Sequence, residues 1–175
     1  MSDLDVQAIR KTIKAIERAK SSLISAYNTY RTSADALVNH VDQVAHQQGF
    51  TVAQAQQLMA QNYPPGDSTG IVAGWVYMVA DEVVDLDNGL VQDALDAADN
   101  LPSNTALRLL ADEVNNPSTS RWRLMEIRDS VEEAKKTAFR SLNEIRCARV
   151  RVKYELERAR NGKDGIPWRY LLFDE

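Results

Sequence analysis

The sequence predicts an all-α protein in which two long antiparallel helices form a coiled-coil-like rod pair with a small inserted helical subdomain. Two observations support this fold class. Apolar residues recur at alternating three- and four-residue steps over residues 6–44 and again over residues 124–159. The seven glycines and five prolines are few and cluster between these periodic segments, as expected of residues that separate helices.

The first periodic segment predicts a helix from about residue 3 or 5 to residue 48, with Gly49 at the usual left-handed position beyond its end. Its stripe fills twelve consecutive a and d positions, namely Val6, Ile9, Ile13, Ile16, Lys20, Leu23, Tyr27, Tyr30, Ala34, Leu37, Val41 and Val44. Another helix must cover such a stripe. We expect Lys20, Tyr27 and Tyr30 to fix register and partner choice, with the facing helix supplying a hydrogen-bond partner for the buried phenols.

The middle of the chain predicts short helices separated by turn residues. They are expected over about residues 52–62, 71–86, 90–99 and 106–114. A capping box beginning at Thr51 opens the first, and Asn88 with Gly89 is expected to end the second, which is apolar nearly all round and therefore buried. We expect Trp75, in that helix, and Trp122 to pack in the core.

The second long helix is expected over about residues 119–161, with Gly162 just beyond its end. Because its length matches that of the first helix, we expect the two to pair in opposite directions, capped at one end by the short helices. The predicted domains are a rod pair of residues 1–49 and 118–162, an inserted acidic subdomain of residues 50–117, and a docking tail of residues 163–175.

Composition narrows the class of protein. Apolar residues make up 44% of the chain and charged residues 26%, as in ordinary globular proteins. The single cysteine, Cys147, excludes a disulfide framework or a cysteine zinc site within one chain. The first residues carry Asp3 and Asp5 but no apolar run, so we expect no secretory signal. We also expect no membrane span and a cytosolic protein. A viral or mobile-element origin is a further hypothesis.

Charge is unevenly distributed along the chain. Residues 77–116 hold nine acids and one base, whereas residues 117–163 hold thirteen lysines and arginines and seven acids. Such a separation indicates either pairing of two faces within the molecule or two distinct partner surfaces. The sequence leaves both interpretations open.

One interpretation of the acidic segment is a metal site. Glu82 with Asp85, and Asp96 with Asp99, each place two carboxylates one helical turn apart, and convergent carboxylates suit Mg²⁺. Residues 81–86 also resemble the second metal motif of all-helical nucleotide pyrophosphohydrolases. That resemblance implies a metal-dependent nucleotide hydrolase, although the paired glutamates of that family's first motif have no counterpart upstream.

The basic segment suggests a different alternative. Arg146, Arg149, Lys153 and Arg160 follow one stripe of the last long helix. Such a stripe could track the phosphates of a nucleic acid or another polyanion. Charged flanks of a coiled coil give the same pattern.

The leading hypothesis is a non-enzymatic interaction or assembly protein, a scaffold or an adaptor or inhibitor, without a cofactor. Trp168, Tyr170 and Phe173 give the tail an aromatic cluster suited to anchoring an interface. We expect protein partners and a homo-oligomer, because two rods alone leave much apolar stripe uncovered. Nucleic-acid binding and metal-dependent hydrolysis remain the alternatives.

Overall fold

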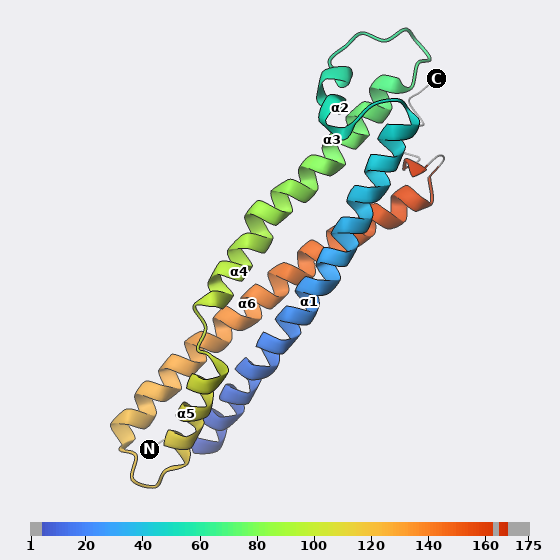
Figure 1. Cartoon of the computed structure of the whole chain (residues 1–175). Coiled ribbons are helices and arrows are strands. Elements are labelled where there is room, and N and C mark those ends of the chain that lie inside the picture. Colours follow the sequence, from blue (N-terminus) through green and yellow to red (C-terminus); the bar gives the residue numbers. More distant parts are fainter. Residues whose placement is uncertain (1–4, 163–164, 168–175) are drawn as a thin grey trace. The chain divides into compact units, whose positions relative to one another are not determined.

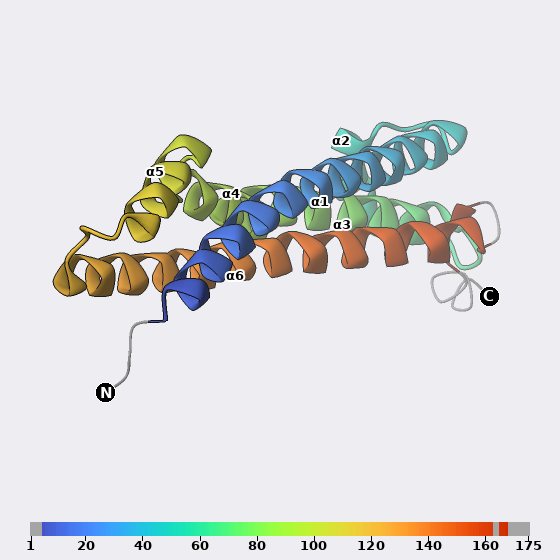
Figure 2. The ribbon, with the colours of Figure 1, turned by 90° about the horizontal axis from the view of Figure 1, so that it is seen from below.

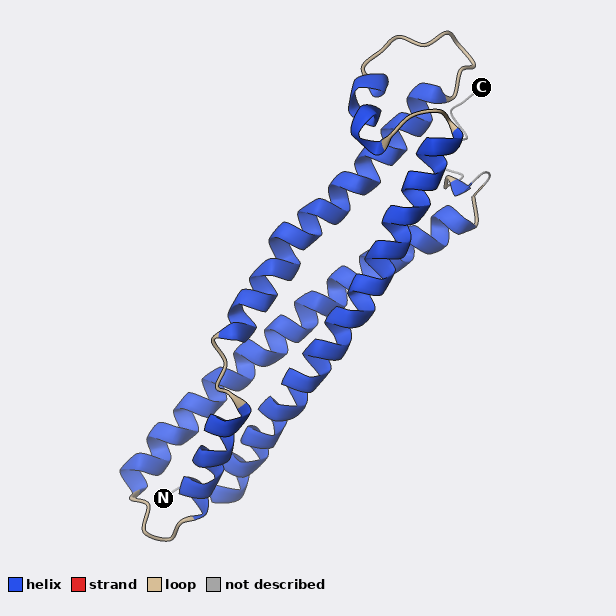
Figure 3. Cartoon of the chain, in the orientation of Figure 1, coloured by secondary structure: helices blue, strands red, loops and turns tan. Residues whose placement is uncertain are grey.

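The structure, a computed structural model, describes residues 5–162 and 165–167, and these residues contain helices but no strand (Figure 3). The elements are α1 (Val6–Gln47), α2 (Val52–Met59), α3 (Thr69–Leu86), a π-helical turn η1 (Asp87–Val91), α4 (Gln92–Asp99), α5 (Asn104–Asn115) and α6 (Arg121–Arg160). The predicted all-α class, with two long helices that pack against each other, is confirmed.

The contacts divide the chain into two compact units, each of which is described by itself. Unit 1 comprises Met1–Tyr27 and Val91–Arg146, and unit 2 comprises Asn28–Leu90 and Cys147–Glu175. Both long helices therefore contribute to both units. The segment 50–117, expected as one inserted subdomain, is divided between the units after Leu90.

Local signals at the helix ends act as the sequence predicts. The Asp5 carboxylate accepts hydrogen bonds from the backbone N–H groups of Gln7 (2.9 Å) and Ala8 (3.2 Å) at the start of α1. Gly49 adopts a positive φ of 85° beyond its end, and the N–H of Phe50 reaches back to the carbonyl of Ala45 at 3.1 Å, which closes the helix in a Schellman motif. The capping box at Thr51 is present as well.

The heptad stripe of α1 is the core of both units. Nine of its twelve positions are buried, and Val6, Lys20 and Tyr27 are half-buried. In unit 1 the stripe packs in a cluster with residues from α5 and α6, namely Ile9, Ile13, Ile16, Leu107, Val114, Ile127 and Val131. The spacing thus identified correctly which side of α1 faces other helices.

In unit 1, α5 runs in the opposite direction to both long helices. Near the start of α5, the Lys20 ammonium donates to the carbonyl of Pro102 (2.7 Å) and to Oδ1 of Asn104 (3.1 Å). Near its end, Arg123 at the start of α6 donates to both carboxylate oxygens of Glu113. These hydrogen bonds hold the pKa of Glu113 below its usual value. Within this unit α1 and α6 therefore run in the same direction (Figure 1, Figure 2).

In unit 2, α3 likewise runs in the opposite direction to α1. The Tyr30 hydroxyl donates to the carboxylate of Asp87, just beyond the end of α3. The His40 ring lies edge-on to Trp75, in the first half of α3, with the ring centroids 6.2 Å apart. Increasing residue numbers in α1 thus meet decreasing numbers in α3.

The same unit gives the direction of α6. Arg151 donates to Oε1 of Glu82 at 2.9 Å, and Nε2 of His40 lies 2.7 Å from the carbonyl oxygen of Gly165, which follows α6. The end of α6 is therefore level with the end of α1 and the beginning of α3. In this unit too, α1 and α6 run in the same direction (Figure 1).

Within each unit the two long helices pair as expected but run in the same direction, so the expected antiparallel direction of the rod pair is wrong. The prediction treated residues 50–117 as a cap at one end. Instead, α5 in unit 1 and α3 in unit 2 each make antiparallel contacts with both long helices, so within each unit the last helix has the direction of the first.

The expected helix end at Asn88 and Gly89 is also wrong. Helical structure continues through η1 into α4. Successive buried apolar residues on either side of this turn, Leu86 and Val91, are five positions apart, which is the period of a π turn rather than of an α-helix. The turn residues Asn88 and Gly89 therefore lie inside a π turn that accommodates one extra residue within the helix.

Trp75 is fully buried as expected, whereas Trp122 is 71% exposed. Trp122 lies two positions before Leu124, which places it about 200° around α6 from the apolar stripe. A large side chain on that side has no neighbouring helix to pack against. The core prediction for Trp122 is therefore wrong.

Removing the Tyr30 hydroxyl tests the polar contact at the π turn. We expect Tyr30→Phe to lower the free energy of unfolding by about 1–3 kcal/mol, because the half-buried Asp87 carboxylate loses a donor. Urea denaturation measures this change. The control is Tyr63→Phe, whose exposed hydroxyl donates to Gln61 at 3.4 Å and whose loss should change stability by less than about 0.5 kcal/mol. Equal stability of the two variants would contradict a structural role for this contact.

Gly165 provides a second test, because it has a φ of 79° and an added Cβ would lie 2.6 Å from Cε1 of His40. Gly66 has a similar φ of 87° with open space around it. We expect Gly66→Ala to cost about 1–2 kcal/mol from backbone strain alone and Gly165→Ala to cost clearly more. Thermal denaturation compares the two variants, and equal melting temperatures would show that Gly165 does not pack against His40.

Candidate functional site

The predicted interface residues fall into two groups. Trp168, Tyr170 and Phe173 lie outside the described residues. Lys20 and Tyr30 bond within their own units, to α5 and to η1, and Tyr30 has no exposed surface. Together with the half-buried Tyr27, they belong to the packing of the chain itself. The predicted hydrogen-bond partner of the buried Tyr30 phenol is present as Asp87.

The beginning of the predicted docking tail packs against unit 2. Ile166 is 2% exposed and Pro167 is buried. The carbonyl of Gly165 lies at hydrogen-bonding distance from His40. These contacts fix where the tail leaves α6.

The four acids of the metal hypothesis lie in different units. Glu82 and Asp85 belong to α3 in unit 2, whereas Asp96 and Asp99 belong to α4 in unit 1. Oδ1 of Asp96 accepts a hydrogen bond from Gln92 at 2.8 Å. In the part of the chain that the structure describes, no group of three or more metal-ligating side chains is close enough to hold an ion.

The four basic residues of the polyanion hypothesis are also divided. Arg146 belongs to unit 1, and Arg149, Lys153 and Arg160 belong to unit 2. Arg149 is half-buried, and the ammonium of Lys153 lies 4.0 Å from the carboxylate of Glu157 on the same helix. The three residues of unit 2 follow one flank of α6 at helical spacing.

A groove of about 520 Å³ lies on the opposite flank of α6, between this helix and α3. Its lining combines apolar and acidic side chains, namely Tyr77, Met78, Asp81, Glu82, Asp85, Leu86, Leu90 and Arg151. All of these residues belong to unit 2. The groove is the centre of what we call the α3–α6 face.

The charges in this groove are not balanced. Arg151 pairs with Glu82 at 2.9 Å. Over residues 5–162 and 165–167, neither Asp81 nor Asp85 has an ion-pair partner, and both are exposed. The α3 side of the face therefore presents two unpaired carboxylates to any ligand that docks there.

The α6 side of the face is apolar, aromatic and basic. Cys147, Tyr154 and Arg158 lie four positions before and three and seven positions after Arg151, which places them on its side of the helix, and Val150 lies beside Cys147 and Tyr154, three and four positions away. Val150 is 58% exposed, Tyr154 is 57% exposed, and Met78 across the groove is 53% exposed. The guanidinium of Arg158 lies 5.3 Å from the centre of the Tyr154 ring, a cation–π contact that orients both side chains.

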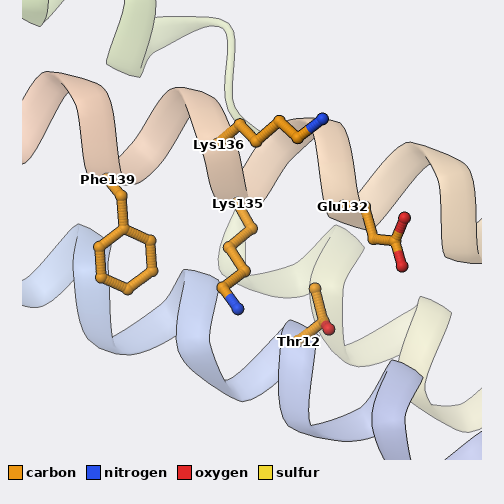
Figure 4. A pocket seen from close by; sticks show the side chains of 5 residues that line it. All are labelled: Thr12, Glu132, Lys135, Lys136 and Phe139. Atoms are coloured by element: carbon orange, nitrogen blue, oxygen red, sulfur yellow. The ribbon is translucent and has the colours of Figure 1, made fainter.

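A second hollow, of about 430 Å³, lies between α1 and α6 in unit 1. Figure 4 shows Phe139 and Lys135 projecting from α6 towards α1, with Thr12 on the opposite helix. The Thr12 hydroxyl already donates to the carbonyl of Ala8 at 3.0 Å. With Glu132 beside the two lysines, this hollow favours no one class of ligand.

The apolar residues of the α3–α6 face are not among those predicted from the sequence. Val150 and Tyr154 lie outside the buried track of α6 but four positions apart, a spacing that puts them on one side of a helix. This second, shorter apolar stripe was the available signal. Met78 was hidden among the many apolar residues of α3.

No family model, curated protein or solved structure matches the chain. Function is therefore argued from the chemistry of the site rather than from fold. None of the helices that the structure describes has an apolar stretch long enough to cross a bilayer.

A matched pair of valines tests the exposure of this face. Val150 is 58% exposed and Val152, on the same helix, is 2% exposed. We expect Val150→Ala to change the free energy of unfolding by less than about 0.5 kcal/mol, and Val152→Ala to lower it by about 1–3 kcal/mol because it leaves a cavity. Chemical denaturation gives both values. A large loss for Val150→Ala would mean that this side of α6 is packed within the chain.

Proposed function

We propose that this chain is a non-enzymatic helical interaction or assembly protein, acting as a scaffold or as an adaptor or inhibitor, that binds protein partners through the α3–α6 face. We further propose that it acts in the cytoplasm. The observation that supports the interaction role is the presence on the α3–α6 face of three large exposed apolar side chains, Met78, Val150 and Tyr154, together with two carboxylates that have no ion-pair partner in the described part of the chain.

This combination has the composition of a protein interface. Interface centres are enriched in aromatic residues, methionine and arginine, and their rims are polar. Met78, Tyr154 and the paired Arg151 supply the first set, and Asp81 with Asp85 supplies the second. A cluster of exposed apolar side chains on one face is a common mark of a docking surface.

The same chemistry favours a protein partner over a nucleic acid. Carboxylates repel phosphates, and three of the eight residues that line the groove are acidic. The whole chain also carries a net charge of −4. A basic amphipathic segment of a partner protein matches both the charge and the apolar surface of the face.

Site-specific photocrosslinking tests this proposal. A photoreactive amino acid at Met78 should crosslink to protein partners in cells, whereas the same residue at Gln43, exposed on α1 of unit 2, should not. We expect Asp81→Lys with Asp85→Lys to reduce the crosslinked product about tenfold or more, because it reverses the charge that attracts the partner. The yield is quantified by immunoblot and the product identified by mass spectrometry.

The charge control is Asp93→Lys with Asp99→Lys, which makes the same change in net charge on exposed positions of α4 in unit 1. It should leave the crosslinks from position 78 unchanged. Equal yields from positions 78 and 43, or equal loss in both charge variants, would contradict a docking role for the α3–α6 face.

A further inference from the structure

We infer that the partner of the α3–α6 face is a second copy of this chain, bound so that the acidic α3 side of each copy lies on the basic, aromatic α6 side of the other. This inference rests on the proposed function and identifies the occupant of the same face. It follows from the charge, the spacing and the direction of the two helices in unit 2.

The face is complementary to itself in charge. Its α3 side carries Asp81 and Asp85, which have no ion-pair partner in the described part of the chain, and its α6 side carries Arg151, whose contact with Glu82 places it close to the level of both acids. Arg151 already donates to Glu82, but a guanidinium has five N–H donors and can donate to a second carboxylate as well. The same face therefore carries both the carboxylates and a guanidinium that attracts them.

A two-fold axis parallel to the helices brings these halves together. Rotation about an axis that lies in the plane of the face and runs along the groove puts α3 of one copy opposite α6 of the other. An axis at right angles to the helices would instead put the acids of α3 on the acids of the second copy. Because like charges across an interface are costly, the first arrangement is the one we infer.

The apolar residues match in the same arrangement. Arg151 is level with Glu82, since their side chains are 2.9 Å apart, and α3 and α6 run in opposite directions. A residue three positions further along α6 is therefore level with a residue three positions earlier in α3. Tyr154 thus lies level with Val79 and next to Met78. Across the two-fold axis, Met78 of one copy contacts Tyr154 of the other, and a thioether against an aromatic ring is a favourable contact.

Charge exchange between variants tests the pairing. The acid variant is Asp81→Lys with Asp85→Lys, and the base variant is Arg151→Glu. We expect sedimentation to show a dimer for the wild-type chain at micromolar to submillimolar concentration. Each variant alone should dimerise about tenfold or more weakly, because a two-fold interface contains every altered contact twice. An equal mixture of the two should regain the dimer as a heterodimer.

Two controls separate pairing from folding. Circular dichroism melting shows that each variant is folded, which we expect because the Arg151–Glu82 pair is exposed and contributes little to stability. Asp93→Lys with Asp99→Lys should dimerise like the wild type.

Cys147 gives an independent signal, since it is the single cysteine and is exposed on this face. Its rate of reaction with a maleimide should fall as wild-type protein concentration rises and stay constant for the acid variant.

Two outcomes would overturn the inference. One is a wild-type chain that is monomeric throughout this range, and the other is a dimer that both charge variants form as well as the wild type. In the first case, dimerisation of residues 1–167 alone would make the tail beyond Pro167 the occupant. Crosslinks from position 78 to another protein, lost in the acid variant, would then leave the proposed function standing. Absence of both crosslinks and dimer would remove the two together.

Discussion

The rest of the structure depends on one constraint, which is that the apolar stripes of α1 and α6 must be covered along their whole length. In each unit a helix of the middle segment covers them, α5 in unit 1 and α3 in unit 2. Helical structure continues past Asn88 and Gly89 because the wider π turn absorbs the extra residue between Leu86 and Val91.

Polar contacts near the core then select one alignment of these helices. An apolar stripe tolerates sliding by a turn, since one leucine or isoleucine packs much like another. The polar residues do not tolerate sliding, because the Lys20 ammonium must reach the carbonyl of Pro102 and the Tyr30 hydroxyl must reach Asp87. A slipped alignment would break both hydrogen bonds, at a cost that apolar contacts do not replace. The two contacts, one in each unit, therefore fix the register of the helices.

Sequence alone predicted the elements far better than their arrangement. The buried stripe of α1, Gly49, the capping box at Thr51 and the burial of Trp75 follow from local rules, and each is present. The direction of α6 does not follow, because a periodic stripe reports which residues face a neighbour but not which neighbour they face. Parallel and antiparallel pairs bury the same positions. The deciding contacts, such as Glu82 with Arg151, join residues distant in sequence.

The candidate site shows the same limit. Its acidic residues were visible in the sequence, but whether an acid is paired depends on what lies across the groove, and among the described residues Glu82 alone of the three pairs with an arginine. The acids thus differ on one helix: Glu82 joins α3 to α6, whereas Asp81 and Asp85 are exposed and have no ion-pair partner in the part of the chain that the structure describes. Because the residues that hold unit 2 together point inward while those of the face point outward, recognition can change without loss of the fold. A surface of this kind can acquire or lose a partner by substitutions that leave the core, and hence stability, almost untouched.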